Sequence, residues 1–542
     1  MVADQHPPTS DRAEERDRIG ARGIWLICVA CAALAVVMGA MTALNVALPE
    51  IAPSIGATST EMTWLVDAYT VALAALLLPS GAIGDRFGRR GLLIIGLAIF
   101  AAASTPPLWT DDPTAIIASR ALSGVAAAMV MPSTLSLLTS QLPERKRPLA
   151  VSLWAGVGGA AGIGGFFVSG FLLEWFSWRS IFIVFTVVAA LLAMASATIG
   201  TSRDEHSKPF DVPGALVSTA AVFLFVVGLL ETPTRGWDDA VTLGALGAGL
   251  VLGVVFVVVE RRRAAPLLDV HLFANRAFSA GALTVMVQFF ASLGLFYVVL
   301  QRLQLDFGMS PLMAATAVMP VVVVIMILSP IGTWLAVRYS LRSMLVLGVS
   351  LTGIGLILMG VVPYTTYWGM FPMLMLGAVG QGFATAPPTT AIMANTPAAT
   401  QGIGSAVNDT FRELGAAIGI AVSGSILASG YTRNIAPVAD RVSAETGSSQ
   451  LGEHIARSLA EALHTIDALA TRLPGRTETL DAVADQAKQA FIGPMNTACV
   501  VMGIVILVGV AFLIFLSPRA MTPVSASTSE TETEPEREPA AG

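Results

Sequence analysis

The chain has 542 residues, of which 54% are hydrophobic and 13% are charged, and its mean hydropathy is +0.72. These values exclude a soluble globular protein of this length. The net charge of -6 at pH 7 says little about partners, because acidic residues gather in one loop and in the tail segment 530–538.

Fourteen apolar stretches have the length of a bilayer-spanning helix and lack the alternation of a β-barrel strand. We expect helices near 24–48, 61–80, 91–108, 114–139, 149–173, 180–200, 212–230, 241–259, 277–300, 311–336, 342–362, 367–392, 401–428 and 492–517. The first stretch is too long for the core of a cleavable signal peptide. Cys28, Cys31 and Cys499 lie inside these stretches, and no second cysteine pair completes a redox or metal site.

Basic residues predict how the helices are oriented. With both tails inside, about nineteen Lys and Arg residues flank helices on the inner side, against about three in the short outer loops. We therefore expect a multi-pass protein of the inner (plasma) membrane with both termini in the cytoplasm. One outer loop, 431–491, is long. Its apolar residues at helical spacing favour a small extracellular helical cap, and a solvated spacer is the alternative.

Residues 81–90, Gly-Ala-Ile-Gly-Asp-Arg-Phe-Gly-Arg-Arg, form a short charged turn between two apolar stretches. Glycines allow the chain to fold back sharply. We expect Asp85 to accept hydrogen bonds from the N-terminus of the helix that follows Thr396 and Pro397, and so to act as a gate latch. The segment 336–342 repeats this turn loosely. The predicted gating residues are Gly81, Gly84, Asp85, Arg86, Gly88, Arg89 and Arg90.

The pattern GxxGDRxGRR strongly resembles the signature between helices 2 and 3 of the major facilitator superfamily of transporters. Further motifs follow in order. They are Asn45-Val46-Ala47-Leu48-Pro49, Trp64 with Tyr69, Arg120 with Gly124, Glu231 with Gly236 and Trp237, and the run from Gly404 to Gly415. Together they look like the fourteen-helix drug:proton antiporter branch, of the multidrug efflux type, from about residue 24 to 517.

This resemblance implies an all-α membrane protein with the major facilitator fold, in which two six-helix bundles flank two inserted helices. The expected division is a cytoplasmic tail 1–22, a first bundle 23–200, a linker with the inserted helices 201–263, a second bundle 264–517 that includes loop 431–491, and a disordered acidic cytoplasmic tail 518–542. Two departures from the branch affect coupling. Ala40 replaces its usual Asp, and the glycine-rich helix over 149–173 lacks its usual proline.

Two acidic residues in the 401–428 helix are candidate proton carriers, because a buried carboxyl group can switch between neutral and ionised forms. At 1.5 Å per residue from Ile403, Asp409 lies about 9 Å and Glu413 about 15 Å into the span. Arg412 can reach Asp409 across one turn. The alternative is an interfacial amphipathic segment, which leaves only a short stretch to span the bilayer.

Asp67 is a further proton-coupling candidate, with a solvated interfacial Asp as the alternative. Thr58 and Glu61 predict a capping box that starts its helix two turns upstream. Because Ala40 cannot titrate, we hypothesise that Asp67 and Glu413 share the proton and cation roles of the missing acid.

Arg120 lies in the 114–139 helix and is costly to leave unpaired in lipid. The resemblance implies a role in proton movement, and a structural ion pair with a neighbouring helix is the alternative. Three acids at helix ends, Glu174, Glu231 and Glu260, are expected to be solvated.

Aromatic and amide side chains are the candidates for contact with a lipophilic substrate, and ordinary helix packing is the alternative for each. The candidates for the substrate cavity are Asn45, Tyr69, Gln288, Phe289, Phe290, Tyr297, Gln301, Gln381 and Phe383.

No lysine follows a glycine as a phosphate-binding loop requires, so an ion gradient, with the proton as coupling ion and no cofactor, is the expected energy source. The five histidines show no catalytic or metal-ligand spacing, so no enzyme is expected. We expect a monomeric proton-coupled antiporter that exports amphipathic or cationic small molecules by alternating access, with membrane lipid around it and no nucleic acid or nucleotide partner. The alternatives are a dedicated exporter of one endogenous metabolite or lipid, and a non-transporting sensor or scaffold.

Overall fold

The structure is a computed structural model, and it describes residues 20–202, 209–472 and 477–518. The predicted tails 1–22 and 518–542 lie almost wholly outside these residues. The described part of the chain is built from helices and contains no strand.

Fourteen helices in the described part correspond to the fourteen predicted spans. The first six are α2 (Ala21–Ile55), α3 (Ser59–Phe87), α4 (Arg89–Ala103), α5 (Pro113–Gln141), α6 (Arg147–Trp175) and α7 (Arg179–Ser196). The other eight are α8 (Val212–Arg235), α9 (Ala240–Glu260), α10 (Arg276–Gln301), α11 (Pro311–Arg338), α12 (Leu341–Val361), α13 (Tyr367–Ala394), α14 (Gln401–Thr446) and α17 (Thr477–Leu516). Length and hydropathy alone identify twelve of them as possible spans, and α6 joins them as a bent span.

Polar side chains start several of these helices by accepting hydrogen bonds from the free backbone N–H groups of the first turn. The capping box predicted for α3 is present. The hydroxyl of Thr58 accepts from the Glu61 N–H at 3.3 Å, and the Glu61 carboxylate accepts from the Thr58 N–H at 2.8 Å. Asp112 and Asp239 cap α5 and α9 in a related way.

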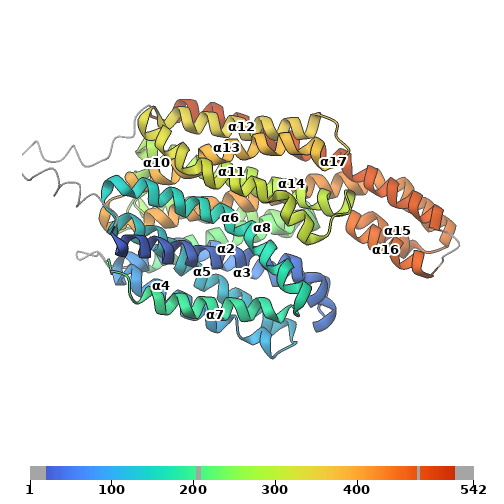
Figure 1. The fold of residues 1–542 in the computed structure, drawn as a ribbon, viewed down its shortest axis with the longest axis horizontal. Coiled ribbons are helices and arrows are strands. Elements are labelled where there is room, and N and C mark those ends of the chain that lie inside the picture. The colour runs from blue at the N-terminus through green and yellow to red at the C-terminus, as the bar shows by residue number, and fades with distance from the viewer. Residues whose placement is uncertain (1–19, 203–208, 473–476, 519–542) are drawn as a thin grey trace, which may run out of the picture.

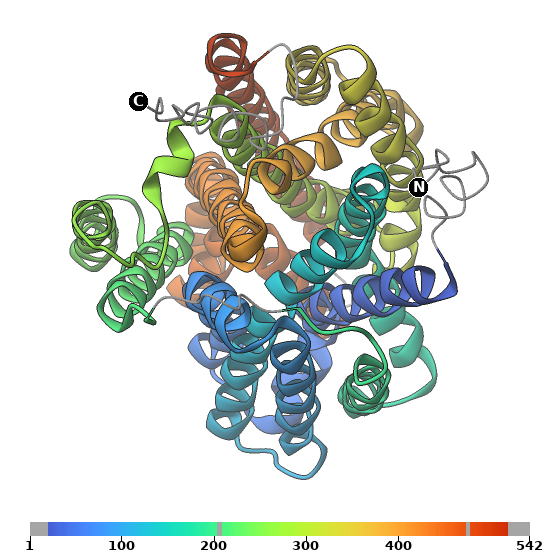
Figure 2. The same cartoon turned by 90° about the vertical axis from the view of Figure 1, so that its left-hand side faces the viewer.

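The helices form two bundles that pack against each other. One buried apolar cluster is built mainly by α2 to α7, and a second mainly by α10 to α14 with α17. Between the bundles, α6 contacts α11 and α13, while α14 contacts α3 and α5. Figure 2 shows α14, in orange, near the middle of the end view. Side chains on α6 and α14 are therefore placed to face the opposite bundle.

The inserted helices α8 and α9 lie at the side of the molecule, at the left of Figure 2. They pack on each other, and α8 also contacts α3 and α14. Many apolar side chains of α9 are exposed, among them Leu250, Val251 and Val254. Apolar side chains on an outer helix face are expected where the solvent is lipid.

A helical cap stands beyond one end of the bundles (Figure 1). The long helices α14 and α17 continue into it, and α15 (Ser449–Arg457) and α16 (Leu459–Arg472) connect them. The Tyr431 hydroxyl of α14 donates to the Ile455 carbonyl at 3.0 Å. The described part of loop 431–491 is thus helical rather than a solvated spacer, and its extracellular position stays a prediction.

Helix α6 bends by 41° between Glu144–Gly162 and Gly164–Trp175, although the usual proline is missing. Close packing on α2 accompanies the bend. A Cβ at Gly165 would lie only 2.4 Å from the Gly39 carbonyl oxygen, so the two backbones touch here. Glycines therefore allow this bend next to α2 without proline.

Candidate functional site

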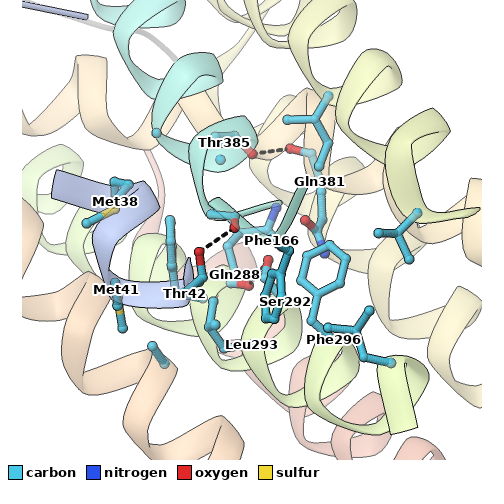
Figure 3. Close-up of a pocket in the computed structure, with 18 of the residues that line it drawn as sticks. Met38, Met41, Thr42, Phe166, Gln288, Ser292, Leu293, Phe296, Gln381 and Thr385 are labelled. Carbon is cyan, nitrogen blue, oxygen red and sulfur yellow. Dashed lines mark hydrogen bonds between the residues drawn. The ribbon is translucent and has the colours of Figure 1, made fainter. Parts of the chain in front are cut away.

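A mostly apolar cavity lies between the two bundles (Figure 3). Its walls come from α2, α6, α10, α11, α13 and α14. Thioether and aromatic side chains in the wall include Met38, Met41, Phe166, Phe289 and Phe296. Its volume is about 100 Å³, below the roughly 300–1,000 Å³ of pockets for drug-sized molecules. The walls must therefore move apart to admit such a molecule.

The few polar groups in the wall fall into two kinds. Hydroxyls donate to nearby carbonyls, as from Thr42 to Gly162 at 2.6 Å and from Thr385 to Gln381 at 2.6 Å (Figure 3). In contrast, both amide atoms of Gln288 and one carboxylate oxygen of Glu413, Oε2, are buried without a hydrogen-bond partner. These unpartnered atoms are the ones available to a ligand or a proton.

Glu413 belongs to a buried charged group on α14. Asp409, Arg412 and Glu413 are 0%, 3% and 3% exposed, so the interfacial alternative predicted for this segment is wrong. The Arg412 Nη2 atom lies 3.9 Å from Asp409 Oδ1, and the Asn408 amide donates to the same oxygen at 3.1 Å. Of Asp409, Arg412 and Glu413, Glu413 is the one that lines the cavity.

Arg412 also connects the two bundles. Its guanidinium lies 4.9 Å from the ring centre of Trp154 on α6 and 4.8 Å from that of Phe289 on α10. Its Nε and Nη1 atoms have no hydrogen-bond partner. The aromatic rings therefore hold this charge by cation–π contact, beside the cavity wall formed by Phe289.

Arg120 is buried in the first bundle, and no carboxylate of the described residues pairs with it. It donates to the backbone carbonyls of Leu65 and Ala40, each at 3.1 Å, and lies 4.4 Å from the ring centre of Tyr69. The Tyr69 hydroxyl in turn donates to the Val37 carbonyl at 2.8 Å. The predicted structural ion pair is thus replaced by carbonyl and ring contacts, one of them at Ala40 itself.

Asp67 does not line the cavity. It is half-buried on α3, one turn before Val71, and helical spacing puts the two side chains on one face. Val71 packs in a cluster with Val226 and Leu229 of α8. Asp67 therefore faces the inserted helices on the side of α8.

The charged segment 81–90 lies against the start of α14. The predicted ten-residue turn is wrong, because residues 81–87 end α3, α4 begins at Arg89, and Gly88 alone lies between the two helices. Asp85 accepts hydrogen bonds from the backbone N–H groups of Gly402 at 2.8 Å and Ile403 at 2.9 Å, as the sequence predicts. Its carboxylate also pairs with Arg89 at 2.7 Å, and Arg89 is 1% exposed. We call Asp85, Arg89 and the α14 N-terminus the latch, and the end of the bundles that carries it the basic end. The gating role of the latch stays a prediction.

Three of the nine predicted substrate-cavity residues, Gln288, Phe289 and Gln381, line the cavity. The other six lie elsewhere. Tyr69 is under Arg120, Phe290 is in the apolar core, Asn45 is exposed, and Tyr297, Gln301 and Phe383 lie outside the lining. The sequence alone did not identify Met38, Met41, Thr42, Phe166, Ser292 and Thr385. One signal in the sequence could have found three of them: Met38, Met41 and Thr42 are spaced to share one helix face, and the helix over 149–173 is rich in glycine.

Glu260 corrects a prediction, because it is 2% exposed rather than solvated. One of its carboxylate oxygens accepts from the Leu268 N–H at 2.9 Å, in the loop that follows α9. The predicted solvation does hold for Glu174, which is exposed, while Glu231 is half-buried and pairs with Arg235 at 2.7 Å.

The amino-acid sequence of this chain is similar to those of known transporters. Residues 29–420 match the model of the Major Facilitator Superfamily. The multidrug efflux pump LfrA of Mycolicibacterium smegmatis is 32% identical over 90% of this chain and 96% of its own length. The tetracenomycin C resistance and export protein of Streptomyces glaucescens is 30% identical over 89% and 90%. The methyl viologen resistance protein SmvA of Salmonella typhimurium is 29% identical over 84% and 90%.

Solved structures agree with the fold. The proton:xylose symporter XylE, bound to a bromodeoxyglucose, superposes with a TM-score of 0.59 at 11% sequence identity, over 93% of this chain and 98% of the symporter. The human organic anion transporter MFSD10 gives 0.53 at 16% identity, over 74% and 93%.

Proposed function

This chain belongs to the major facilitator superfamily, and from that membership we propose that it is a proton-coupled antiporter that exports amphipathic or cationic small molecules by alternating access. Its family and its efflux and export relatives make it a multi-pass membrane transporter rather than an enzyme. The observation that carries the proposal is Glu413, a buried carboxylate with an unpartnered oxygen in the wall of a cavity between the bundles.

The chemistry of the cavity supports the proposed substrate class. Its wall offers aromatic faces and thioethers, which adapt to varied apolar shapes. A single carboxylate beside Phe289 adds attraction for positive charge through Coulomb and cation–π terms. A lipophilic organic cation satisfies both parts of this wall.

Proton coupling follows from the position of the same carboxylate. When Glu413 is ionised it attracts a cationic substrate, and when it takes up a proton that attraction is lost and the substrate is released. When one proton exchanges for one monovalent cation, the electrical terms cancel and the pH gradient drives the exchange. A gradient of one pH unit supplies about 1.4 kcal/mol per proton, enough for a roughly tenfold concentration ratio of the exported cation.

Helix α14 connects the coupling group to the proposed gate. Its first turn is held by Asp85, and Glu413 lies ten residues further on, about 15 Å along the axis. Motion of α14 relative to α3 would therefore have two effects at once: it would break the latch, and it would displace Glu413. We propose that the basic end faces the cytoplasm of a plasma membrane, so the latched state is closed on that side.

Efflux in inverted membrane vesicles tests this function. Vesicles that contain the protein should accumulate ethidium, a fluorescent organic cation, when a pH gradient is imposed. Nigericin, which dissipates that gradient, should abolish the accumulation. Accumulation that survives nigericin and an added uncoupler contradicts proton coupling, and none above empty-vector vesicles contradicts export of organic cations.

A dedicated exporter of one compound is the second candidate, because several relatives are named for single compounds, among them tetracenomycin C, methylenomycin A and cephamycin. Expression in a sensitive host separates the two. Resistance to several unrelated lipophilic cations supports the broad exporter, and resistance to one chemical family only supports the dedicated one.

A further inference from the structure

Two buried acids meet where the inserted helices reach the basic end. Asp211 caps the start of α8 through Oδ1, which accepts from the Gly214 N–H at 3.0 Å. Glu260 is the last residue of α9 and accepts from the Leu268 N–H. Their side chains meet beside Gly214. They are 5% and 2% exposed, so neither is solvated.

One oxygen of each acid has no partner. Asp211 Oδ2 and Glu260 Oε1 are both buried without a hydrogen bond. Both lie beside Gly214, where an added Cβ would come within 2.7 Å of the first and 2.4 Å of the second. Two ionised carboxylates in this position repel each other, while a single proton between them turns the repulsion into a hydrogen bond.

One basic residue of the described part of the chain forms an ion pair with these two acids. Arg263 pairs with Asp211 Oδ1 at 3.0 Å and balances one carboxylate. The adjoining polar pocket is also lined by Asp85 and Arg86 of α3, by Arg261, Asp269 and His271 of the loop 261–275, and by the start of α14. Asp85 is neutralised by Arg89, and Asp269 accepts from His271. No third metal-ligand side chain joins the two acids in the described residues.

We propose that Asp211 and Glu260 bind one proton between them, and that the protonated pair holds the inserted helices and the loop 261–275 next to the latch. Loss of the proton puts two negative charges beside Gly214, which drives the loop away from the ends of α8 and α9. None of these residues lines the cavity, so this site is separate from Glu413.

Infrared difference spectroscopy of the full-length protein in lipid nanodiscs tests the shared proton directly. A protonated carboxyl group has a carbonyl stretch that a carboxylate lacks. The wild type should lose such a band as pH rises, and Glu260→Gln and Asp211→Asn should each remove that band. Glu231→Gln, at the other end of α8, is the matched control and should leave it unchanged. A spectrum that neither variant alters overturns the proposal.

The position of the loop gives a second readout. Leu267 is 3% exposed and lines the pocket, so Leu267→Cys in a background with Cys28, Cys31 and Cys499 replaced by Ser reports loop opening. The readout is the maleimide labelling rate of Leu267→Cys divided by that of the exposed Ser449→Cys, which removes the pH dependence of thiol reactivity. This ratio should rise about tenfold from low to high pH. Added Glu260→Gln should keep the ratio at its low-pH value, because the amide still donates to Asp211 and cannot lose that hydrogen. A ratio that does not change with pH, or changes equally in both proteins, overturns the proposal.

Discussion

Glu413 is the single carboxylate among the described residues of the cavity wall, and its environment sets what it can do. Its Oε2 atom has no hydrogen bond, and Arg412, its neighbour in the chain, is held between Trp154 and Phe289. The carboxyl group is therefore free to exchange a proton or to face a ligand. Asp409, one turn away, is outside the wall and interacts with Arg412 instead.

Replacement of Glu413 by Gln should abolish coupled export while the fold is retained. The amide has nearly the same shape but cannot ionise, so it neither attracts a cationic substrate nor releases a proton. We expect the initial rate of pH-driven ethidium transport to fall at least about tenfold, which is about 1.4 kcal/mol of lost stabilisation. Stopped-flow fluorescence of inverted vesicles measures this rate.

Glu174→Gln is the matched control, because Glu174 is exposed at the end of α6 and undergoes the same chemical change. It should transport at the wild-type rate. If Glu413→Gln transports as fast as this control at equal expression, Glu413 is not the coupling group.

The sequence predicts part of this residue-level picture. Spacing along one helix suffices for Asp409, Arg412 and Glu413, because their contacts are local and their depth follows from the helical rise. It does not suffice for Asp67, whose face of α3 turns out to pack towards α8. Which side of a helix faces the cavity depends on pairing between distant segments, and an apolar all-round helix carries no pattern that shows it.

At the scale of the helices, α3 and α14 approach each other more closely than side chains permit. A Cβ at Gly81 would lie 2.5 Å from the Gly402 carbonyl oxygen and 2.6 Å from the Ala406 Cβ. The same contact brings Asp85, one turn later on α3, to the first N–H groups of α14. The latch therefore depends on a glycine that lets the two backbones touch.

Gly81→Ala should weaken the closed basic end. The added methyl group cannot fit without separating α3 from α14, and such overpacking costs about 1–3 kcal/mol. We expect maleimide labelling of Ser405→Cys, a buried position on α14, to become at least about five times faster in the cysteine-free protein.

Gly91→Ala is the control for the general effect of a glycine-to-alanine change in a helix, because nothing lies within 4 Å of the added Cβ. In this variant Ser405→Cys should be labelled at the parental rate. Asp85→Asn removes the latch charge without adding volume and should speed labelling in the same direction. Unchanged labelling in both Gly81→Ala and Asp85→Asn contradicts the latch.

The helix ends show what hydropathy can and cannot predict. The fourteen spans follow from apolar length, yet α14 runs on to Thr446 and α17 begins at Thr477, well outside the predicted 401–428 and 492–517. These extensions are polar on one face and pack on α15 and α16. A bilayer-length criterion ends a helix where its apolar run ends, although packing against the cap continues it.

At the scale of the whole molecule, the two ends of the bundles differ in kind. One end carries the latch, the basic turns and the carboxyl pair of Asp211 and Glu260. The other carries the cap, where α15 and α16 pack on the extended α14 and α17 (Figure 1). The sequence predicts this polarity through the distribution of Lys and Arg. It does not predict that α6 packs on α11 and α13 to enclose the cavity, because such long-range pairing leaves no local signature.

The positive-inside rule turns this polarity into a prediction about sidedness, with the basic end in the cytoplasm and the cap outside. In the cysteine-free background, Ser449→Cys in the cap should react with a membrane-impermeant maleimide in intact cells. Glu144→Cys, whose native side chain is 88% exposed next to Arg145 and Lys146 at the basic end, should react only after the cells are permeabilised. The two positions serve as each other's control, because both lie on solvent-exposed helix starts and differ only in the end of the bundles. Labelling of Glu144→Cys but not of Ser449→Cys in intact cells would reverse the orientation, and the latched state would then be closed to the outside.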